Sequence, residues 1–522
     1  MKNQNKKKLT NDEIGILFLL AALLFGGWFR IYPAMVSEFP INDGGLFMVA
    51  IESIQNNQFR LPMTINYNTL EIPFAYPPLA FYIAGYLGFA LKISIIELLK
   101  WLPAIVLILT LPCVYYLATL FLKSKLLAGI ATFLYSVTPR SITWMIMGGG
   151  ITRSIGQLFL ILAISQVYQL YNKGDKKYIY SSILFSTIVC LTHPEATLHA
   201  LAMVFILWVF YGRNARGIKY SFIVGAGVLL LTSPWWVTVL SRYGAGPFIA
   251  ASQTGLYDPF IVLFIFTPIS EEPLITYISA LAILGLFIQI KNKDFLLPIL
   301  FVLPFLIEPR NALNVAIIPL SMLAAIGLFQ IVISNQLWTK NVAETLETQP
   351  IISSWSQKIF LALILSGTLL GMFSFELELL QKQVSKDARQ TFEWIKRNTK
   401  SDAEFLLITG NEYVFSDYLN EWFPIIAQRH SRTTIQGYEW LERRDFANQA
   451  EFIMGLQGCL NKEIPSKCIE DIAQNRNFYF DYIQVHTLGS NTNNLSINLI
   501  HNTNYEVVYE SKEFLIFKRL ER

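Results

Sequence analysis

Long apolar segments separated by short polar connectors dominate the first three quarters of the chain. A helix needs about 17 or more apolar residues to cross a bilayer, and the pattern predicts about eleven such helices. The predicted spans lie near residues 13–33, 101–122, 126–147, 154–171, 178–194, 196–211, 219–236, 273–290, 294–309, 311–333 and 359–376. The sequence therefore predicts a polytopic α-helical membrane protein.

The first apolar segment follows a basic N-terminus, as it would in a signal peptide. The stretch from Ile14 to Tyr32 is too long for the apolar region of a signal peptide, and no small-residue cleavage site follows it. We therefore interpret it as a retained first span.

Lysine and arginine divide the connectors into two classes. The richer class comprises Lys2, Lys6, Lys7, Lys8, Lys123, Lys125, Lys173, Lys176, Lys177, Arg213, Arg216, Lys219, Lys291, Lys293, Lys340 and Lys358. Because cytoplasmic loops carry the excess of positive charge, these connectors are predicted to face the cytoplasm. The N-terminus is then cytoplasmic and the C-terminal domain extracytoplasmic.

Residues 76–92 test this topology, because they are apolar enough to be a further span. If they crossed the bilayer, every later loop would change sides and the lysine-rich loops would face outward. We therefore place 34–100 wholly outside as the first outer loop, with 43–56 and 76–92 as interfacial helices.

The chain divides into a transmembrane domain, 1–376, and an extracytoplasmic α/β domain, 377–522. In the second domain, 386–399 has the spacing of an amphipathic helix, with Ala388, Phe392 and Ile395 on one face. Residues 403–409 form a short apolar strand, and 505–520 predict two strands around a turn at Ser511–Lys512.

Composition supports the membrane prediction. Of the 522 residues, 53% are hydrophobic and only 15% are charged, whereas soluble domains average about 25% charged residues. The net charge of +4 is too small and dispersed to indicate a nucleic-acid partner. Cys459 and Cys468 lie nine positions apart in the C-terminal domain, and the pattern fits either a disulfide or two free thiols.

Asp43 is the first candidate for chemistry, in the segment FPINDGGLF of the first outer loop. Its carboxylate can act as a general base or as a metal ligand. Alternatively, Asn42 or Asp43 caps a helix that begins at Gly44.

Other acids and a histidine are predicted at the same membrane face. His193 and Glu195 flank Pro194 in LTHPEATLHA, with His199 one turn further on. This group is a candidate metal or acceptor site, or else a buried turn in which Glu195 caps the next helix. Glu271 and Glu272, in FTPISEEPLI, either join that site or cap a helix.

Three arginines lie at the outer ends of predicted spans. Arg310 follows Glu308 in IEPRNALN, Arg140 lies in VTPRSITW, and Arg153 lies in GGGITRS. A guanidinium can bind phosphate through two parallel hydrogen bonds, although Arg310 can instead pair with Glu308. Acids, a histidine and arginines gathered at one face suit chemistry on a membrane-anchored phosphate. A transporter is less well supported, since no charge lies near mid-bilayer and no inverted repeat is evident.

The order of these motifs resembles the GT-C-type membrane glycosyltransferases, in particular bacterial relatives of the protein O-mannosyltransferases and the aminoarabinose transferases of lipid A. The resemblance rests on NDGG at 42–45 in a long first outer loop, YPPL at 76–79, the run PRNALNVAIIPLSMLAAIGL, and the C-terminal segments WIKRNTKSDAEFLLITG and EWFPIIAQRHSRTTIQGYEW. It covers most of the chain.

The resemblance implies a polyprenyl-phosphate sugar donor, with transfer at the outer face of the lipid bilayer to a glycan, lipid or protein acceptor. It implies that Asp43 is the catalytic acidic residue and that Arg310, Arg153 and Arg140 contact the donor phosphate. A divalent cation, Mg²⁺ or Mn²⁺, is an open expectation, because Asn42 replaces a second acid beside Asp43 and the second outer loop has no paired acids. Alternative functions are a lipid-linked glycan transporter and a polymerase or ligase of surface polysaccharide.

Overall fold

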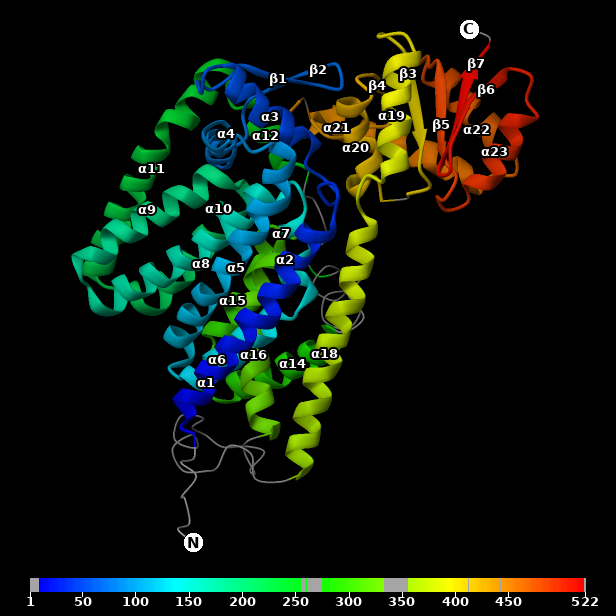
Figure 1. Cartoon of the computed structure of the whole chain (residues 1–522). Coiled ribbons are helices and arrows are strands. Elements are labelled where there is room, and N and C mark those ends of the chain that lie inside the picture. The colour runs from blue at the N-terminus through cyan, green and yellow to red at the C-terminus, as the bar shows by residue number, and fades with distance from the viewer. Residues whose placement is uncertain are drawn as a thin grey trace.

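The computed structural model consists of a long helical bundle with a small α/β domain at one end (Figure 1). The residues that it describes are 9–254, 260, 275–332, 355–411, 413–441 and 443–520. Helix α1 and the α/β domain lie at opposite ends of the bundle in Figure 1.

Each predicted span corresponds to a helix. The helices of the bundle are α1 (Asn11–Ala21), continued by η1 (Ala22–Gly26) and α2 (Gly27–Val36); α5 (Ile95–Leu122); α6 (Lys125–Ser136); α8 (Gly150–Lys173); α9 (Lys176–Thr192); α10 (Pro194–Leu207), continued by η3 (Trp208–Gly212); α11 (Ala215–Tyr243); α14 (Ile275–Lys291); α15 (Leu296–Ile307); α16 (Ala312–Val332); and α18 (Trp355–Gln381).

Seven helices in the described residues are long and apolar enough to cross a membrane, including α5, α8 and α16. Others, such as α6 and α15, are apolar but shorter than a span normally requires. The chain is therefore a multi-pass membrane protein, while the number of about eleven crossings stays a prediction.

The predicted span at 126–147 is wrong in its second half. Helix α6 ends at Ser136, and the chain continues as two short helical turns, η2 (Pro139–Ser141) and α7 (Thr143–Ile146). Pro139 lacks an amide hydrogen and disfavours helical backbone at the residue before it, so α6 cannot continue through it. The segment that follows leads into the glycine run at 148–150, which lies at the candidate site.

The first outer loop contains the two helices predicted for it. These are α3 (Gly45–Asn56) and α4 (Leu79–Leu91), joined through a hairpin of β1 (Thr64–Tyr67) and β2 (Leu70–Pro73). Another short helix on this face, α12 (Gly246–Ser252), follows α11. The hairpin and α3 lie at the end of the bundle that carries the α/β domain (Figure 1).

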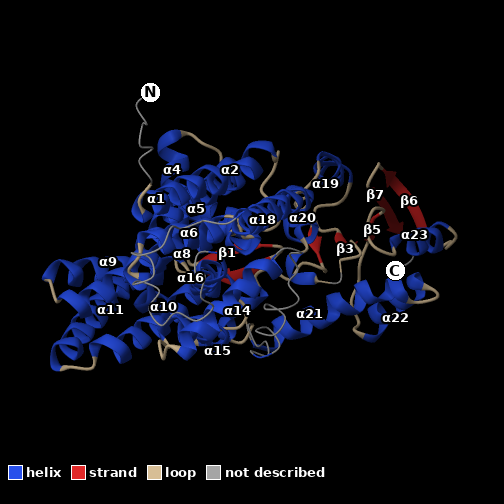
Figure 2. Ribbon diagram, turned by 90° about the horizontal axis from the view of Figure 1, so that it is seen from below, coloured by secondary structure: helices blue, strands red, loops and turns tan. Residues whose placement is uncertain are grey.

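The C-terminal domain is a five-stranded mixed sheet with helices on both faces. Its elements are α19 (Lys386–Asn398), β3 (Glu404–Ile408), η4 (Val414–Ser416), α20 (Tyr418–Ile426), β4 (His430–Ser431), η5 (Tyr438–Trp440), α21 (Arg443–Gly458), η6 (Cys459–Asn461), α22 (Pro465–Asn475), β5 (Tyr482–His486), α23 (Thr492–Ile500), β6 (Tyr505–Glu510) and β7 (Phe514–Arg519). The strand order is β4-β3-β5-β7-β6, with β3 parallel to β4 and β5 and with β7 antiparallel to its neighbours. Figure 2 shows the strands between α19 and α22.

Two hydrophobic clusters hold this domain. The predicted face of α19, formed by Ala388, Phe392 and Ile395, is buried as expected. It packs with Trp422 of α20 in a cluster that also contains Leu46 of α3 and Ile65 of the β1–β2 hairpin. The opposite face of the sheet packs against α21, α22 and α23 in a separate cluster. The α/β domain therefore shares one hydrophobic core with the first outer loop.

Candidate functional site

Asp43 lies just before α3 and does not cap it. The cap position is Gly44, a residue that has no side chain to cap α3 itself. The Asp43 carboxylate instead accepts a hydrogen bond from the Gly149 amide at 2.8 Å and pairs with the Arg153 guanidinium at 2.7 Å. Asp43 therefore does not cap α3 as the alternative prediction had it. Its carboxylate binds Arg153 of α8 and Gly149 in the loop before α8.

The glycines around Asp43 allow this close approach. Gly44 has a φ of +127°, a backbone conformation that residues other than glycine rarely adopt. A Cβ on Gly149 would lie 2.5 Å from the Asp43 Oδ2 atom, and a Cβ on Gly148 would meet the Asp43 carbonyl oxygen. The glycine run at 148–150 therefore brings a backbone donor against the carboxylate.

Arg153 is held by more than one contact. Besides Asp43, its guanidinium donates to the Trp144 carbonyl oxygen at 3.0 Å and lies 5.5 Å from the centre of the Trp144 ring. The Arg153 side chain is 20% exposed and that of Asp43 is 14% exposed. An ion pair shielded to this degree fixes the direction of the carboxylate.

Tyr76, from the YPPL motif, lies between the Asp43–Arg153 pair and His193. Its hydroxyl lies 3.1 Å from the Thr152 hydroxyl, one residue before Arg153. Burial raises the pKa of the Tyr76 hydroxyl; the charge of Glu195 also raises it, and those of Arg153 and Arg310 lower it. All three charges therefore act on one buried hydroxyl.

The histidine predictions are resolved in part. His193 caps α10, because its Nδ1 atom accepts a hydrogen bond from the Ala196 amide at 3.2 Å. The predicted cap, Glu195, instead lies with its carboxylate 3.9 Å from the His193 Nε2 atom. The His193 ring also contacts the Tyr76 ring edge-on, with 6.5 Å between centres. His193 and Glu195 thus lie beside the same tyrosine as Arg153.

The Glu308 carboxylate binds the backbone amide of Arg310 and not its guanidinium. The Glu308 carboxylate accepts from the Arg310 amide at 3.1 Å and from the Asn311 amide at 2.8 Å. The Nε2 atom of the buried His199 ring lies 3.7 Å from the Glu308 Oε2 atom, the same oxygen that accepts from the Asn311 amide. The Arg310 guanidinium itself donates to the Thr254 hydroxyl at 3.2 Å and is solvent-exposed.

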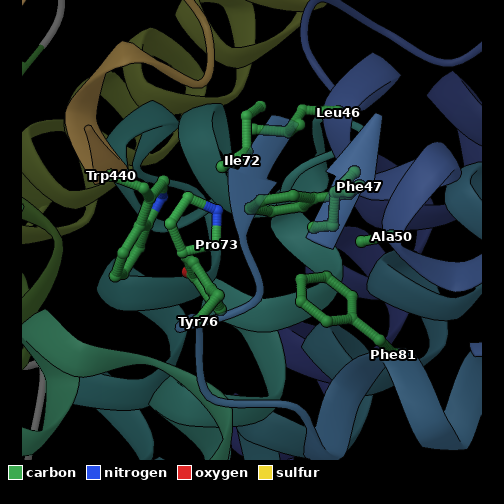
Figure 3. Close-up of a pocket in the computed structure, with 9 residues that line it drawn as sticks. Leu46, Phe47, Ala50, Ile72, Pro73, Tyr76, Phe81 and Trp440 are labelled. Carbon is green, nitrogen blue, oxygen red and sulfur yellow. The ribbon is translucent and has the colours of Figure 1, made fainter. Parts of the chain in front are cut away.

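Tyr76 also lines an apolar pocket (Figure 3). It is lined by Leu46, Phe47, Ala50, Ile65, Ile72, Pro73, Tyr76, Phe81 and Trp440. The residues come from α3, the β1–β2 hairpin, the segment between β2 and α4, α4 itself and η5. Tyr76 and Trp440 pack edge-on, with 5.4 Å between ring centres. The C-terminal domain therefore contributes a wall to a pocket of the membrane domain.

The C-terminal domain also contributes a buried carboxylate beside Asp43. Glu421, on α20, is 4% exposed and accepts a hydrogen bond from the Gly44 amide at 2.9 Å. Burial, and then the charge of Asp43, raise the pKa of Glu421 to about 8, although backbone amides oppose the shift. Burial and the nearby charge of Asp43 thus both favour the protonated form of Glu421.

The remaining predicted site residues are Arg140, Glu271 and Glu272. Arg140 is buried on η2, which packs against α7 and α16. Glu271 and Glu272 lie outside the described residues. Within the described ranges, no three His, Cys, Asp or Glu side chains are arranged to hold a metal ion.

The sequence missed three contributors. Tyr76 appeared only as part of a motif, and its position between Arg153, Glu195 and Arg310 required the fold. Glu421 and Trp440 lie in the segment EWFPIIAQRHSRTTIQGYEW, which carries no recognisable catalytic or binding motif of its own. Glu421 directly precedes the apolar run WFPIIA, whereas Trp440 follows the largely polar stretch QRHSRTTIQGYE.

Known proteins were compared with the chain by sequence and by structure. No protein-family model matches it, and no curated protein matches it. The fold is similar to that of ArnT from Cupriavidus metallidurans in the apo state, with a TM-score of 0.52 at 12% identity, covering 96% of this chain and 97% of ArnT. The structure of ArnT bound to undecaprenyl phosphate gives a TM-score of 0.48 at 12% identity, with the same coverage.

The arabinofuranosyltransferase AftD from Mycobacteria is similar to 97% of this chain, with a TM-score of 0.51 at 12% identity. The matched part is 40% of AftD. At such identities a structural match shows the fold alone. The resemblance drawn from the sequence motifs is confirmed at that level: this multi-pass membrane protein has the fold of the GT-C-type glycosyltransferases.

Proposed function

We propose that the chain is a membrane glycosyltransferase that moves a sugar from a polyprenyl phosphate to an acceptor hydroxyl at the outer membrane face. The observation that carries the proposal is the Asp43 carboxylate, held by Gly149 and Arg153 between the first outer loop and α8. ArnT, whose apo structure shares this fold, has been crystallised with undecaprenyl phosphate. That ligand supports the class of donor, and the sugar and the acceptor stay open.

In the proposed reaction, an acceptor oxygen attacks the anomeric carbon of the donor sugar. Asp43 takes the proton of the attacking hydroxyl as a general base. The bond from the anomeric carbon to the phosphate oxygen breaks, and the electron pair leaves with the polyprenyl phosphate. Arg310 stabilises the added negative charge of this phosphate. Arg153 orients the Asp43 carboxylate before the acceptor arrives.

The proposed sidedness follows from charge and from the disulfide. Lys125 pairs with Asp12 at the start of α1, at the end of the bundle that lies away from the α/β domain. Cys459 and Cys468 form a disulfide in that domain. Because disulfides persist in oxidising compartments, its presence supports an extracytoplasmic domain and a cytoplasmic N-terminus.

Label transfer tests the proposal. Purified protein in liposomes is supplied with undecaprenyl phosphates that carry radiolabelled hexoses or pentoses, together with cell-envelope glycans, lipids and proteins. We expect one donor to give label on an acceptor and Asp43→Asn to reduce the rate by about 10²–10⁴-fold, the usual contribution of a general base.

The matched control is Asp402→Asn, at an exposed aspartate of the C-terminal domain. This variant should transfer label at the wild-type rate. Wild-type transfer by Asp43→Asn would exclude the proposed base. Movement of labelled donor across the liposome membrane with its sugar–phosphate bond intact would favour a transporter instead.

A further inference from the structure

The backbone around Asp43 is bound by the C-terminal domain as well as by the membrane domain. The Asn42 amide donates to the Lys382 carbonyl oxygen at 2.6 Å, and the Asn42 carbonyl oxygen accepts from the Trp422 indole at 2.8 Å. The neighbouring Ile41 forms a β-bridge with Gln383. Both peptide groups of Asn42 are thus fixed by residues more than 300 positions later in the chain.

Glu421 binds the same segment on its other side. Its Oε1 atom accepts hydrogen bonds from the amides of Gly44, at 2.9 Å, and Leu46, at 3.4 Å. These amides belong to the first turn of α3, where backbone donors have no partner within their own helix. A side-chain oxygen normally fills this role from a neighbouring position in sequence; here the oxygen belongs to Glu421 on α20, 377 positions from Gly44.

The packing between α3 and α20 shows that this contact is close. A Cβ on Gly45 would lie 3.0 Å from the Glu421 carbonyl oxygen and 2.9 Å from a methyl carbon of Ile425. The hydroxyl of Tyr67 also donates to that carbonyl oxygen. Phe39 and Trp422 pack edge-on, with 4.7 Å between ring centres. The cap is therefore set in a tightly packed contact.

Asp43 lies between the two groups of contacts. Its backbone neighbours on either side, Asn42 and Gly44, are bound by Trp422 and Glu421, while its side chain meets Gly149 and Arg153. A shift of the backbone at this point would move the carboxylate away from its partners. The C-terminal domain therefore fixes the backbone that carries Asp43, and the membrane domain fixes its side chain.

We propose that Glu421 is a positioning residue for the transfer reaction: it caps α3 from the C-terminal domain and so holds Asp43 in its reactive orientation. This inference rests on the proposed role of Asp43. The C-terminal domain would then act on the chemistry of the membrane domain indirectly, through hydrogen bonds to the backbone beside Asp43.

The test compares Glu421→Ala with Glu421→Gln. Alanine removes the acceptor, whereas glutamine keeps an amide oxygen in its place. The control is Glu451→Ala on α21, where the side chain is 75% exposed. Hydrogen–deuterium exchange is measured for the peptide that covers 40–48, and label transfer is measured for kcat and donor KM.

We expect Glu421→Ala to speed exchange in the 40–48 peptide, to lower kcat by about 10- to 100-fold as for other misplaced catalytic groups, and to leave KM nearly unchanged. Glu421→Gln should restore slow exchange and most of kcat, and Glu451→Ala should match wild type. A purely structural role for Glu421 would change exchange across the whole domain and lower the active fraction of protein without this pattern of rescue.

Wild-type exchange in the 40–48 peptide, or wild-type kcat, in Glu421→Ala would overturn the inference. If that variant does not fold, Trp422→Phe is used, because it removes the indole donor to the Asn42 carbonyl oxygen and keeps an aromatic ring in the buried position. It should show the same faster exchange and lower kcat, and wild-type values would likewise overturn the inference. If Asp43→Asn is active, the proposed function fails independently, and the exchange data still report whether Glu421 caps α3.

Discussion

The disulfide between Cys459 and Cys468 should contribute measurably to the stability of the C-terminal domain. The two cysteines connect the end of α21 with α22 and lie nine positions apart. Loop-closure entropy for a ring of this length gives about 2.6 kcal/mol at 25 °C. The change to make is Cys459→Ala with Cys468→Ala, because serine would place a hydroxyl at the buried Cys459 position.

The expected result is a lower unfolding temperature of the full-length protein in detergent. For a domain of about 140 residues, a loss of this size corresponds to roughly 5–10 °C. Tryptophan fluorescence follows the transition, since Trp422 and Trp440 are buried in the domain and at its contact with the first outer loop. Dithiothreitol should lower the wild-type transition by the same amount and leave the double variant unchanged.

Thiol labelling checks the oxidation state directly. Protein taken from membranes is denatured and alkylated with or without prior reduction, and the mass of the peptides is measured. Cys113 and Cys190 are free in the structure and should react in both cases, whereas Cys459 and Cys468 should react only after reduction. Alkylation of Cys459 and Cys468 without reduction would refute the argument, and with it the support that the disulfide gives to an extracytoplasmic domain.

Three further changes test the site. Gly149→Ala places a Cβ 2.5 Å from the Asp43 carboxylate and should lower kcat by about 10- to 100-fold, while Gly225→Ala, with nothing within 4 Å of the added carbon, should match wild type in label transfer. Arg310→Ala should raise the KM for the polyprenyl-phosphate donor about tenfold or more, since a charged hydrogen bond contributes about 1.5–3 kcal/mol; unchanged donor affinity would remove Arg310 from the phosphate site. Glu421 has a pKa of about 8 in the folded state and 4.5 as its ordinary value, so the folded protein keeps a proton that the unfolded chain has lost between these pH values. Stability should therefore fall as pH rises from about 4.5 to about 8, by at most about 1.4 kcal/mol per pH unit, and unfolding midpoints of Glu421→Gln should lack this component.

The sequence predicted best those features that depend on local periodicity. The apolar face of α19, with Ala388, Phe392 and Ile395, recurs at helical spacing and is buried as predicted. The strands β6 and β7 follow one another around a short turn, so their pairing is also local. In contrast, β5 was not predicted, because it pairs in parallel with β3 across more than 70 intervening residues and has no adjacent partner in sequence.

The candidate site was predicted as a set of residues at one membrane face, and its internal connections were not. His193, Glu195 and Arg153 lie around Tyr76. The choice between capping and chemistry for Asp43 was open from sequence, since both uses need the same residue type before a helix. Only the fold brings Arg153, 110 positions later, to that carboxylate.

The two glycines of NDGG show why a short motif can depend on the whole chain. Gly44 has a positive φ, and a Cβ there would lie 2.9 Å from the Gly148 backbone, so it is required by the loop before α8. Gly45 has ordinary helical backbone, and a Cβ there would meet α20 of the C-terminal domain. The first glycine therefore allows Asp43 to reach its partners in the membrane domain, and the second allows Glu421 to reach the amides that follow Asp43. Because a replacement at either position disturbs a different domain contact, the pair couples the proposed catalytic carboxylate to both domains at once.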